Sequence, residues 1–270
     1  MSVSQWGAVL TDEMHAAHVP EGQLFAWSLG GPSLAVKSSR AFVLIDPFTG
    51  SPSEGVWLRM VAVPYDPADL RDVDAVFSTH DHDDHCHRDT LVPIAEHTDA
   101  RFVGPSSSAK KMRTFGLPNE RIAEAVDGQR FTFGDITVTA ARVPDFADPT
   151  SLGWIVSVDG GPTLFHAGDG MSGPEYARIA ETHEITAAAL SVASLLPDGE
   201  KIYLDAQDAV IAAEQLDARV LIPIHWDLWR VVQYDPWEIV TTVQQMRSPL
   251  VVHIPRLGEA MKLTTNGVVR

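Results

Sequence analysis

The chain carries one sequence pattern twice, and this repetition most restricts the folds open to it. In each half, short segments that alternate or are continuously apolar are followed by strands that alternate with helices. A helix with an apolar face must cover a sheet, and a sheet with one free apolar face must cover another layer. The pattern therefore predicts an α/β protein with two sheets packed face to face and helices on both outer faces, a four-layer αββα sandwich.

Apolar periodicity and turn residues place the expected elements along the chain. The expected strands cover residues 24–29, 33–37, 41–45, 74–80, 101–104, 131–143, 152–158, 163–166, 187–192 and 219–225, with a last hairpin at 249–264. The expected helices cover residues 3–18, 87–97, 106–115, 173–183, 205–217 and 236–246. Residues 48–65 hold several Gly, Pro and Ser residues and indicate a loop. Because no linker-like segment separates the two halves, we predict one domain over residues 1–270, with helix 3–18 packed on it.

Charge and composition limit the partners that this protein can have. The 270 residues include 36 acidic and 20 basic side chains, a formal charge of −16. Nucleic acids and anionic membranes attract proteins mainly through Lys and Arg, so this balance favours a small-molecule partner over both. The single cysteine, Cys86, allows no intrachain disulfide and is typical of a reducing compartment. The sequence shows neither a signal-peptide pattern nor an apolar run of membrane-spanning length, so we expect a cytoplasmic protein.

A cluster of histidines and acids directly after the strand 74–80 carries the strongest chemical signal. Four of the eleven histidines lie within residues 80–87. His80 and His82 are two residues apart, so in extended backbone their side chains point the same way. Asp84 and His85 follow where the chain turns into a helix. Imidazole and carboxylate ligands suit Zn²⁺, Fe²⁺ or Mn²⁺, which makes a metal site the favoured interpretation over a surface turn or a helix cap.

Two later strand ends offer the distant ligands that such a site needs. Asp169 follows the strand 163–166 on a glycine turn, and His225 ends the strand 219–225. If both strands run beside the strand that carries His80, the three carboxyl ends meet at one edge of the sandwich. Taken singly, Asp169 could be an ordinary turn residue and His225 an ordinary core histidine.

These motifs resemble a known superfamily. The segments THDHDDH (79–85), FHAGD (165–169) and IPIHWDLW (222–229), in this order and spacing, are similar to the metallo-β-lactamase superfamily and most similar to its L-ascorbate-6-phosphate lactonase family. The likeness spans nearly the whole chain. It implies the αββα fold reached above from the pattern, one or two divalent cations (Mn²⁺ or Zn²⁺), a small-molecule substrate and a homo-oligomer.

The resemblance also implies a ligand set. His80 and His82 would bind the first cation, Asp84, His85 and His225 the second, with Asp169 between them. Many members of the superfamily carry a further histidine where this chain has residues 142–149, a segment without histidine. Asp145 or Asp148 could replace it.

The expected activity is hydrolysis of a small lactone, a phosphorylated sugar-acid lactone by resemblance, through attack of a metal-bound hydroxide. Asp84 would orient the hydroxide and pass a proton to the leaving alkoxide. His166 is a candidate catalytic residue at the pocket rim, although a structural hydrogen bond to the backbone explains it equally well. Asp46 could orient a ligand histidine or serve a turn.

Two other functions share this fold. One is a metal-dependent phosphodiesterase, and the other is a non-catalytic metal-binding protein. A phosphate group on the substrate would need basic or N–H donors. Lys110, Lys111 and Arg230 are candidates for that contact, with solvated surface charges as the better-supported interpretation.

Overall fold

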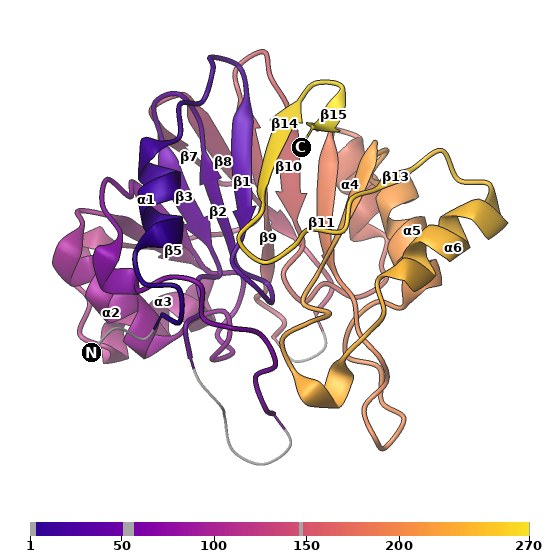
Figure 1. Cartoon of the computed structure of the whole chain (residues 1–270), viewed down its shortest axis with the longest axis horizontal. Coiled ribbons are helices and arrows are strands. Elements are labelled where there is room, and N and C mark those ends of the chain that lie inside the picture. The colour runs from indigo at the N-terminus through magenta and orange to yellow at the C-terminus, as the bar shows by residue number, and fades with distance from the viewer. Residues whose placement is uncertain (1–3, 51–56, 146–147, 270) are drawn as a thin grey trace.

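Two mixed β-sheets pack face to face in the computed structural model, which describes residues 4–50, 57–145 and 148–269 (Figure 1). Within those residues the first sheet has the order β15-β14-β1-β2-β3-β4-β5-β6 and the second the order β13-β12-β11-β10-β9-β8-β7. The strands of the first sheet are β1 (Leu24–Ser28), β2 (Leu34–Lys37), β3 (Phe42–Ile45), β4 (Ala75–Phe77), β5 (Arg101–Gly104), β6 (Ile122–Glu124), β14 (Ala260–Thr264) and β15 (Gly267–Val269). Those of the second are β7 (Arg130–Phe133), β8 (Ile136–Arg142), β9 (Leu152–Val158), β10 (Thr163–His166), β11 (Ala187–Ser191), β12 (Val220–Ile224) and β13 (Val251–Val252).

Each sheet changes from antiparallel to parallel pairing partway across. In the first sheet β1, β2 and β3 pair antiparallel, and β3 to β6 run parallel. In the second, β7 to β10 pair antiparallel, and β10 to β13 run parallel. This topology reproduces the pattern repeated in the sequence, because hairpins connect the antiparallel strands and helices connect most of the parallel ones.

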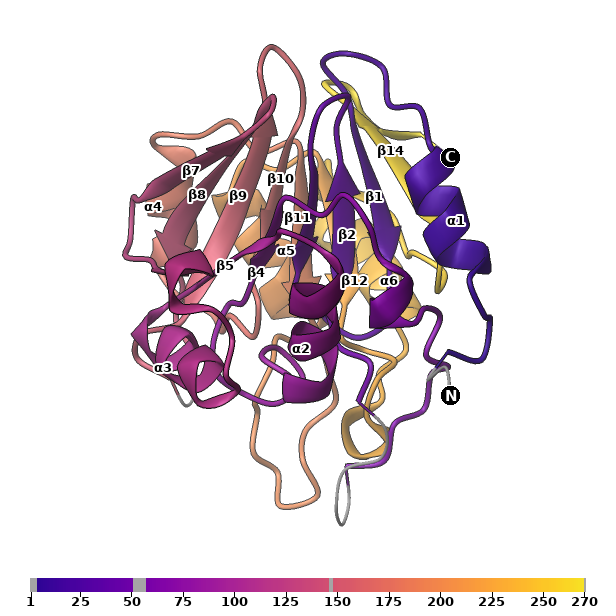
Figure 2. The same ribbon diagram turned by 90° about the vertical axis from the view of Figure 1, so that its left-hand side faces the viewer.

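Helices cover the outer face of both sheets, so the predicted αββα layers are confirmed (Figures 1 and 2). The helices are α1 (Val9–Ala16), α2 (Arg88–His97), α3 (Ser106–Thr114), α4 (Glu175–Ala180), α5 (Ala206–Gln215) and α6 (Trp237–Met246), with short 3-10 turns at Pro67–Asp69, Asn119–Arg121 and Arg230–Val232. Apolar residues of α1, α2 and α3 pack on the first sheet, and those of α4, α5 and α6 pack on the second. A third apolar cluster fills the space between the sheets, where Phe77 meets Trp154.

Local sequence signals account for several element boundaries. The Asp205 side chain accepts a hydrogen bond from the Asp208 N–H and caps α5, as the sequence predicts. The chain leaves α3 at Gly116, which has a φ of +83°, a left-handed conformation that costs glycine little.

Three expected elements differ from the structure. The first helix covers only Val9–Ala16 of the predicted 3–18, since Gly7 adopts a left-handed φ of +60°. The strand predicted at 74–80 ends at Phe77, so the histidine cluster lies wholly in the turn that follows. The predicted hairpin at 249–264 is wrong. β13 pairs with β12 of the second sheet, whereas β14 crosses to β1 of the first.

The segment predicted as a loop at 48–65 holds no regular element beyond a bridge from Arg59 to Trp229, and its residues 51–56 lie outside the described residues. Among the helices of the described residues, none has the length and apolar character needed to cross a bilayer. A single domain over residues 1–270 stays a prediction.

Candidate metal centre

The predicted ligands converge on one edge of the sandwich from both sheets. His80, His82, Asp84 and His85 lie in the turn after β4, Asp169 lies three residues after β10, and His225 directly follows β12. The expectation that these strands run side by side is wrong, because β4 belongs to the first sheet whereas β10 and β12 belong to the second, with β11 between them. The carboxyl ends nevertheless meet, since the two sheets face each other. The site therefore bridges the two halves of the sandwich.

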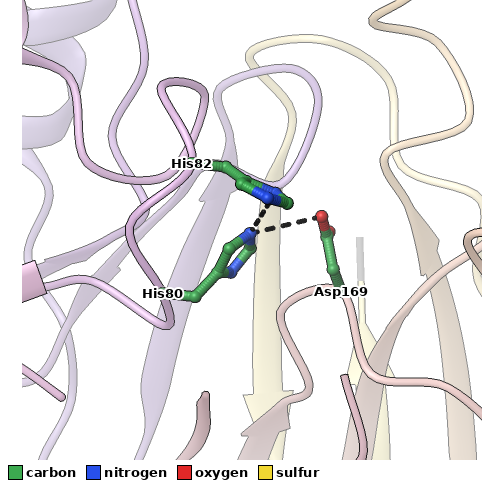
Figure 3. Close-up of side chains that lie close together, drawn as sticks. All are labelled: His80, His82 and Asp169. Atoms are coloured by element: carbon green, nitrogen blue, oxygen red, sulfur yellow. Dashed lines mark hydrogen bonds and ion pairs between the residues drawn. The ribbon is translucent and has the colours of Figure 1, made fainter. Parts of the chain in front are cut away.

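One group of candidate ligands consists of His80, His82 and Asp169. The His80 Nε2 atom lies 2.9 Å from His82 Nδ1 and 3.5 Å from Asp169 Oδ2 (Figure 3). His80 and Asp169 are buried, whereas His82 is exposed at the rim. The two histidines thus face one point, as their spacing predicts, although the backbone between them is a turn and not a strand.

A second group consists of Asp84, His85 and His225, all buried. The His225 Nε2 atom lies 3.3 Å from Asp84 Oδ2, and His85 Nε2 lies 3.8 Å from Asp84 Oδ1. Each residue therefore presents a ligand atom toward the other two. This is the donor set that divalent cations such as Zn²⁺ and Mn²⁺ accept.

Asp169 faces both groups with different oxygens. Its Oδ2 atom points at His80, while its Oδ1 atom lies 3.2 Å from His85 Nε2 and 3.7 Å from His225 Nε2. Within the described part of the chain, His85 Nε2 and Asp169 Oδ1 are fully buried and have no hydrogen-bond partner. Buried polar atoms are rarely left without a partner, so these two atoms fit a site for a cation between them.

Two left-handed backbone positions aim the distant ligands. Gly168 has a φ of +58°, and a Cβ atom there would lie 2.7 Å from the Thr79 side chain, so only glycine allows this close approach ahead of Asp169. His225 has a φ of +66°, which is unusual for a residue with a side chain. Its backbone N–H donates to the Gly31 carbonyl oxygen at 3.0 Å, and this contact holds the strained turn.

Asp46 orients one ligand histidine from the buried end of β3. Its Oδ2 atom lies 2.8 Å from His85 Nδ1, and its Oδ1 atom accepts a hydrogen bond from the Thr79 N–H at 2.8 Å. Because the Nδ1 atom of His85 faces this carboxylate, its Nε2 atom is the one turned toward Asp169. Of the two roles open to Asp46 from the sequence, the structure supports the contact with a ligand histidine.

The charges of the site are strongly coupled. Burial opposes ionisation of Asp169, but His85 and His225 outweigh it and hold the pKa of that carboxyl far below its usual value. Burial likewise opposes protonation of His85, yet Asp169 and Asp46 raise its pKa well above the usual value. Burial and the neighbouring His85 lower the pKa of His80 to about 4. Asp169 is therefore ionised at neutral pH, and a cation that binds His85 displaces the proton that its raised pKa retains.

Two site residues were missed by sequence reasoning. The Trp229 indole N–H donates to Asp84 Oδ2 at 2.7 Å and fixes that carboxylate. The Tyr203 hydroxyl lies 3.3 Å from His225 Nε2, and burial together with Asp169 raises its pKa well above the usual value. Trp229 belongs to a quoted motif, but its contact with Asp84 depends on the tertiary fold. Tyr203 lies in an irregular segment with no motif around it.

Three of the candidate ligands, His82, Asp84 and Asp169, line a cavity of about 560 Å³. Its described lining residues are Phe48, Gly50, Trp57, His82, Asp83, Asp84, His87, Asp145, Asp169, Leu196, Glu200, Ile202, Tyr203 and Trp229. The volume is in the range of small-molecule sites.

Three sequence candidates take different places. His166 is fully buried and does not line the cavity. Its Nε2 atom is hydrogen-bonded to the Pro32 carbonyl oxygen at 2.7 Å, and its Nδ1 atom accepts from the Gly168 N–H. This corrects the expected place of His166 at the rim and favours its structural alternative. The Asp148 carboxylate accepts hydrogen bonds from the Ser107 and Thr150 hydroxyls. Asp145, in contrast, lines the cavity.

The chain is similar to a curated bacterial protein over most of its length. It is 29% identical to the probable L-ascorbate-6-phosphate lactonase UlaG of Escherichia coli O45:K1 (strain S88 / ExPEC). The aligned region covers 87% of this chain and 78% of that protein.

Solved structures show the same fold. Igni18, described as a novel metallo hydrolase from Ignicoccus hospitalis KIN4/I, superposes with a TM-score of 0.70 at 19% identity, covering 89% of this chain and 98% of its own. The isothiocyanate hydrolase from Delia radicum gut bacteria superposes with a TM-score of 0.73 at 18% identity, covering 89% of this chain and 99% of its own. The family model described as beta-lactamase superfamily domain matches residues 42–226, which is more than half of the chain. The protein therefore belongs to the beta-lactamase superfamily domain family and is a hydrolase of the metallo-β-lactamase fold.

Proposed function

We propose that this hydrolase opens a small lactone with the help of one or two divalent cations, Mn²⁺ or Zn²⁺. The observation that carries the proposal is the pair of candidate ligand groups that both face Asp169, beside a cavity of substrate size. The likeness to a probable lactonase supports the reaction class.

Each of the two candidate ligand groups would bind one cation. His80, His82 and Asp169 would hold one cation, and Asp84, His85 and His225 the other, with Asp169 facing both groups. A bound divalent cation supplies hydroxide near neutral pH and polarises a carbonyl oxygen. Asp145 is the described acid placed to complete the more exposed group, because it lines the cavity together with His82.

The protein's own groups position the ester and move the proton. Trp229 holds Asp84 Oδ2, so the carboxylate keeps a fixed orientation from which it can take a proton from the attacking water and pass it to the departing alkoxide. The Tyr203 hydroxyl keeps its proton, given its raised pKa, and can donate a hydrogen bond to an oxygen that gains charge. The apolar side of the cavity excludes bulk water from these contacts.

The proposal extends to partners and location. A small molecule is the expected partner, and the formal charge of −16 argues against nucleic acid or an anionic membrane surface. A cytoplasmic location is supported by the single cysteine, Cys86, because one cysteine allows no intrachain disulfide and is typical of a reducing compartment. The homo-oligomer implied by resemblance stays a prediction.

The test is metal-dependent turnover of a lactone. The chain is stripped with chelator, reloaded with Mn²⁺ or Zn²⁺, and assayed on γ-butyrolactone and on bis-p-nitrophenyl phosphate, beside Asp84→Ala. We expect lactone opening that requires the cation and falls at least a hundredfold in Asp84→Ala. Faster cleavage of the phosphodiester would replace lactonase by phosphodiesterase, and bound metal without turnover of either would favour a non-catalytic protein.

A further inference from the structure

Part of the cavity wall is apolar and aromatic, and through Trp229 it reaches the candidate ligand Asp84. It is formed by five side chains that also pack together beneath the surface: Phe48, Trp57, Leu196, Ile202 and Trp229. The Trp229 ring lies 5.8 Å from that of Phe48 and 6.0 Å from that of Trp57, measured between centroids. We call these five residues the aromatic wall.

Among the described residues, neither Lys nor Arg lines the cavity beside the aromatic wall. Of the described residues that line the cavity, none is Lys or Arg, and residues 51–56 and 146–147 also contain neither in the sequence. The charged lining residues beyond the metal-binding groups are acids, namely Asp83, Asp145 and Glu200. A phosphate placed among these acids would meet like charge, and the basic side chains among the described lining residues are the imidazoles of His82 and His87.

Three basic side chains of this region make other contacts or lie outside the cavity lining. Arg59 lies behind Phe48, with its guanidinium carbon 5.2 Å from the ring centroid, and donates to the carbonyl oxygens of Val61 and Gly50. Lys111 is paired with Asp83 at 2.6 Å. Arg230 is exposed and lies outside the cavity lining.

We propose that the lactone opened here carries an uncharged, apolar substituent, and not a phosphate. This inference rests on the proposed lactonase activity, because the ester carbonyl must reach the metal-binding residues. The rest of the molecule then lies along the aromatic wall, where an alkyl or aryl group is removed from water. The phosphorylated sugar-acid lactone implied by resemblance lacks a complementary partner on this wall.

The first test compares three lactones on the metal-loaded full chain. γ-Butyrolactone has no substituent, γ-nonalactone has a pentyl chain, and L-ascorbate 6-phosphate has a phosphate. We expect kcat/KM to rise about threefold for each methylene buried, so that γ-nonalactone exceeds γ-butyrolactone by at least tenfold. L-ascorbate 6-phosphate should fall below both. Faster turnover of the phosphate ester, or no gain from the pentyl chain, overturns the inference while leaving the lactonase activity established.

A matched pair of variants tests whether the wall is the binding surface. Leu196 lines the cavity and is half-buried, whereas its neighbour Leu195 is 55% exposed and does not line it. We expect Leu196→Arg to reduce the ratio of kcat/KM between γ-nonalactone and γ-butyrolactone at least fivefold. Leu195→Arg, with the same added charge, should keep the wild-type ratio. Equal ratios in the two variants would show that the substituent does not lie on this wall.

A binding measurement separates this inference from the proposed function. The uncharged lactam 5-pentyl-2-pyrrolidinone has no ester to open and is titrated calorimetrically into the metal-loaded chain beside L-ascorbate 6-phosphate. Binding of the lactam with a negative heat-capacity change, and weaker binding of the phosphate, supports the apolar wall even if no lactone is turned over. Tighter binding of the phosphate overturns it.

Discussion

At the scale of single residues, the site depends on neighbours that orient the candidate ligands. Asp46 holds His85 by its Nδ1 atom, Trp229 holds Asp84, and Gly168 lets the chain approach Thr79 closely enough to present Asp169. Contacts of this kind fix the orientation of a ligand and the nitrogen at which a histidine carries its proton.

Replacing Asp46 by Asn should weaken cation binding 10- to 100-fold. An amide N–H at the Oδ2 position would face His85 Nδ1 and drive the imidazole proton to Nε2, the atom that must bind the cation. Competition with a calibrated chelator measures the change.

Asp74→Asn is the matched control for this prediction. The Asp74 carboxylate also accepts a backbone hydrogen bond, from the Phe42 N–H at 2.8 Å, but it lies just before β4, at the end of the strand away from the site. The Asp74→Asn variant should bind the cation with the same affinity as the wild type. If Asp46→Asn binds the cation as tightly as Asp74→Asn does, Asp46 does not orient His85 for cation binding.

The sequence predicts ligands better than it predicts their supporting contacts. His80, His82, Asp84 and His85 form a local motif, so short-range spacing suffices to identify them. Tyr203 meets His225 only because two loops converge, and no local pattern encodes that contact. The place of His166 was missed for the same reason, since its partner at Pro32 is 134 residues away.

At the scale of elements, the turns opposite the site connect the two sheets. Ser38 and Ser39, between β2 and β3, both donate hydrogen bonds to the carboxylate of Asp135, between β7 and β8. Burial raises the pKa of Asp135, but the two hydroxyl donors outweigh it and lower the pKa below the ordinary value of 3.8.

Asp135→Asn should reduce the free energy of unfolding by about 1 kcal/mol at pH 7. A carboxyl with a lowered pKa in the folded state stabilises the protein above its unfolded value of 3.8, and this contribution is lost as the pH falls through the folded value. Urea unfolding at pH 7 and pH 3 should therefore show the difference from wild type shrinking in acid. Asp159→Asn, in the exposed turn after β9, is the control and should change stability at neither pH.

Element boundaries were least predictable where strands exchange sheets. Residues 249–264 read as a hairpin because two apolar runs flank Pro255 and Gly258. Periodicity identifies such runs as strands but not their partners. Here the first run pairs with β12 and the second with β1, a choice decided by which sheet edge remains open.

At the scale of the whole molecule, the ligands join the two sheets, because the turn after β4 meets the loops after β10 and β12. A cation bound there stabilises the folded chain only, since the unfolded chain does not hold the ligands together. With free cation at one hundred times its Kd, the gain is about 2.7 kcal/mol, and Tm should rise by about 5–10 °C. Differential scanning calorimetry across a cation titration measures the rise, and a Tm independent of cation concentration would contradict a site that spans both sheets.

The return of β14 to the first sheet has a consequence for synthesis of the chain. β1 pairs with β2 on one side and with β14 on the other, yet β14 is synthesised long after β1 and β2. Until then, β1 presents an open strand edge that other chains can pair with. We therefore expect the nascent chain to need chaperones until residues 260–264 have emerged, and a ribosome-bound chain that includes them should aggregate less than one that ends before them.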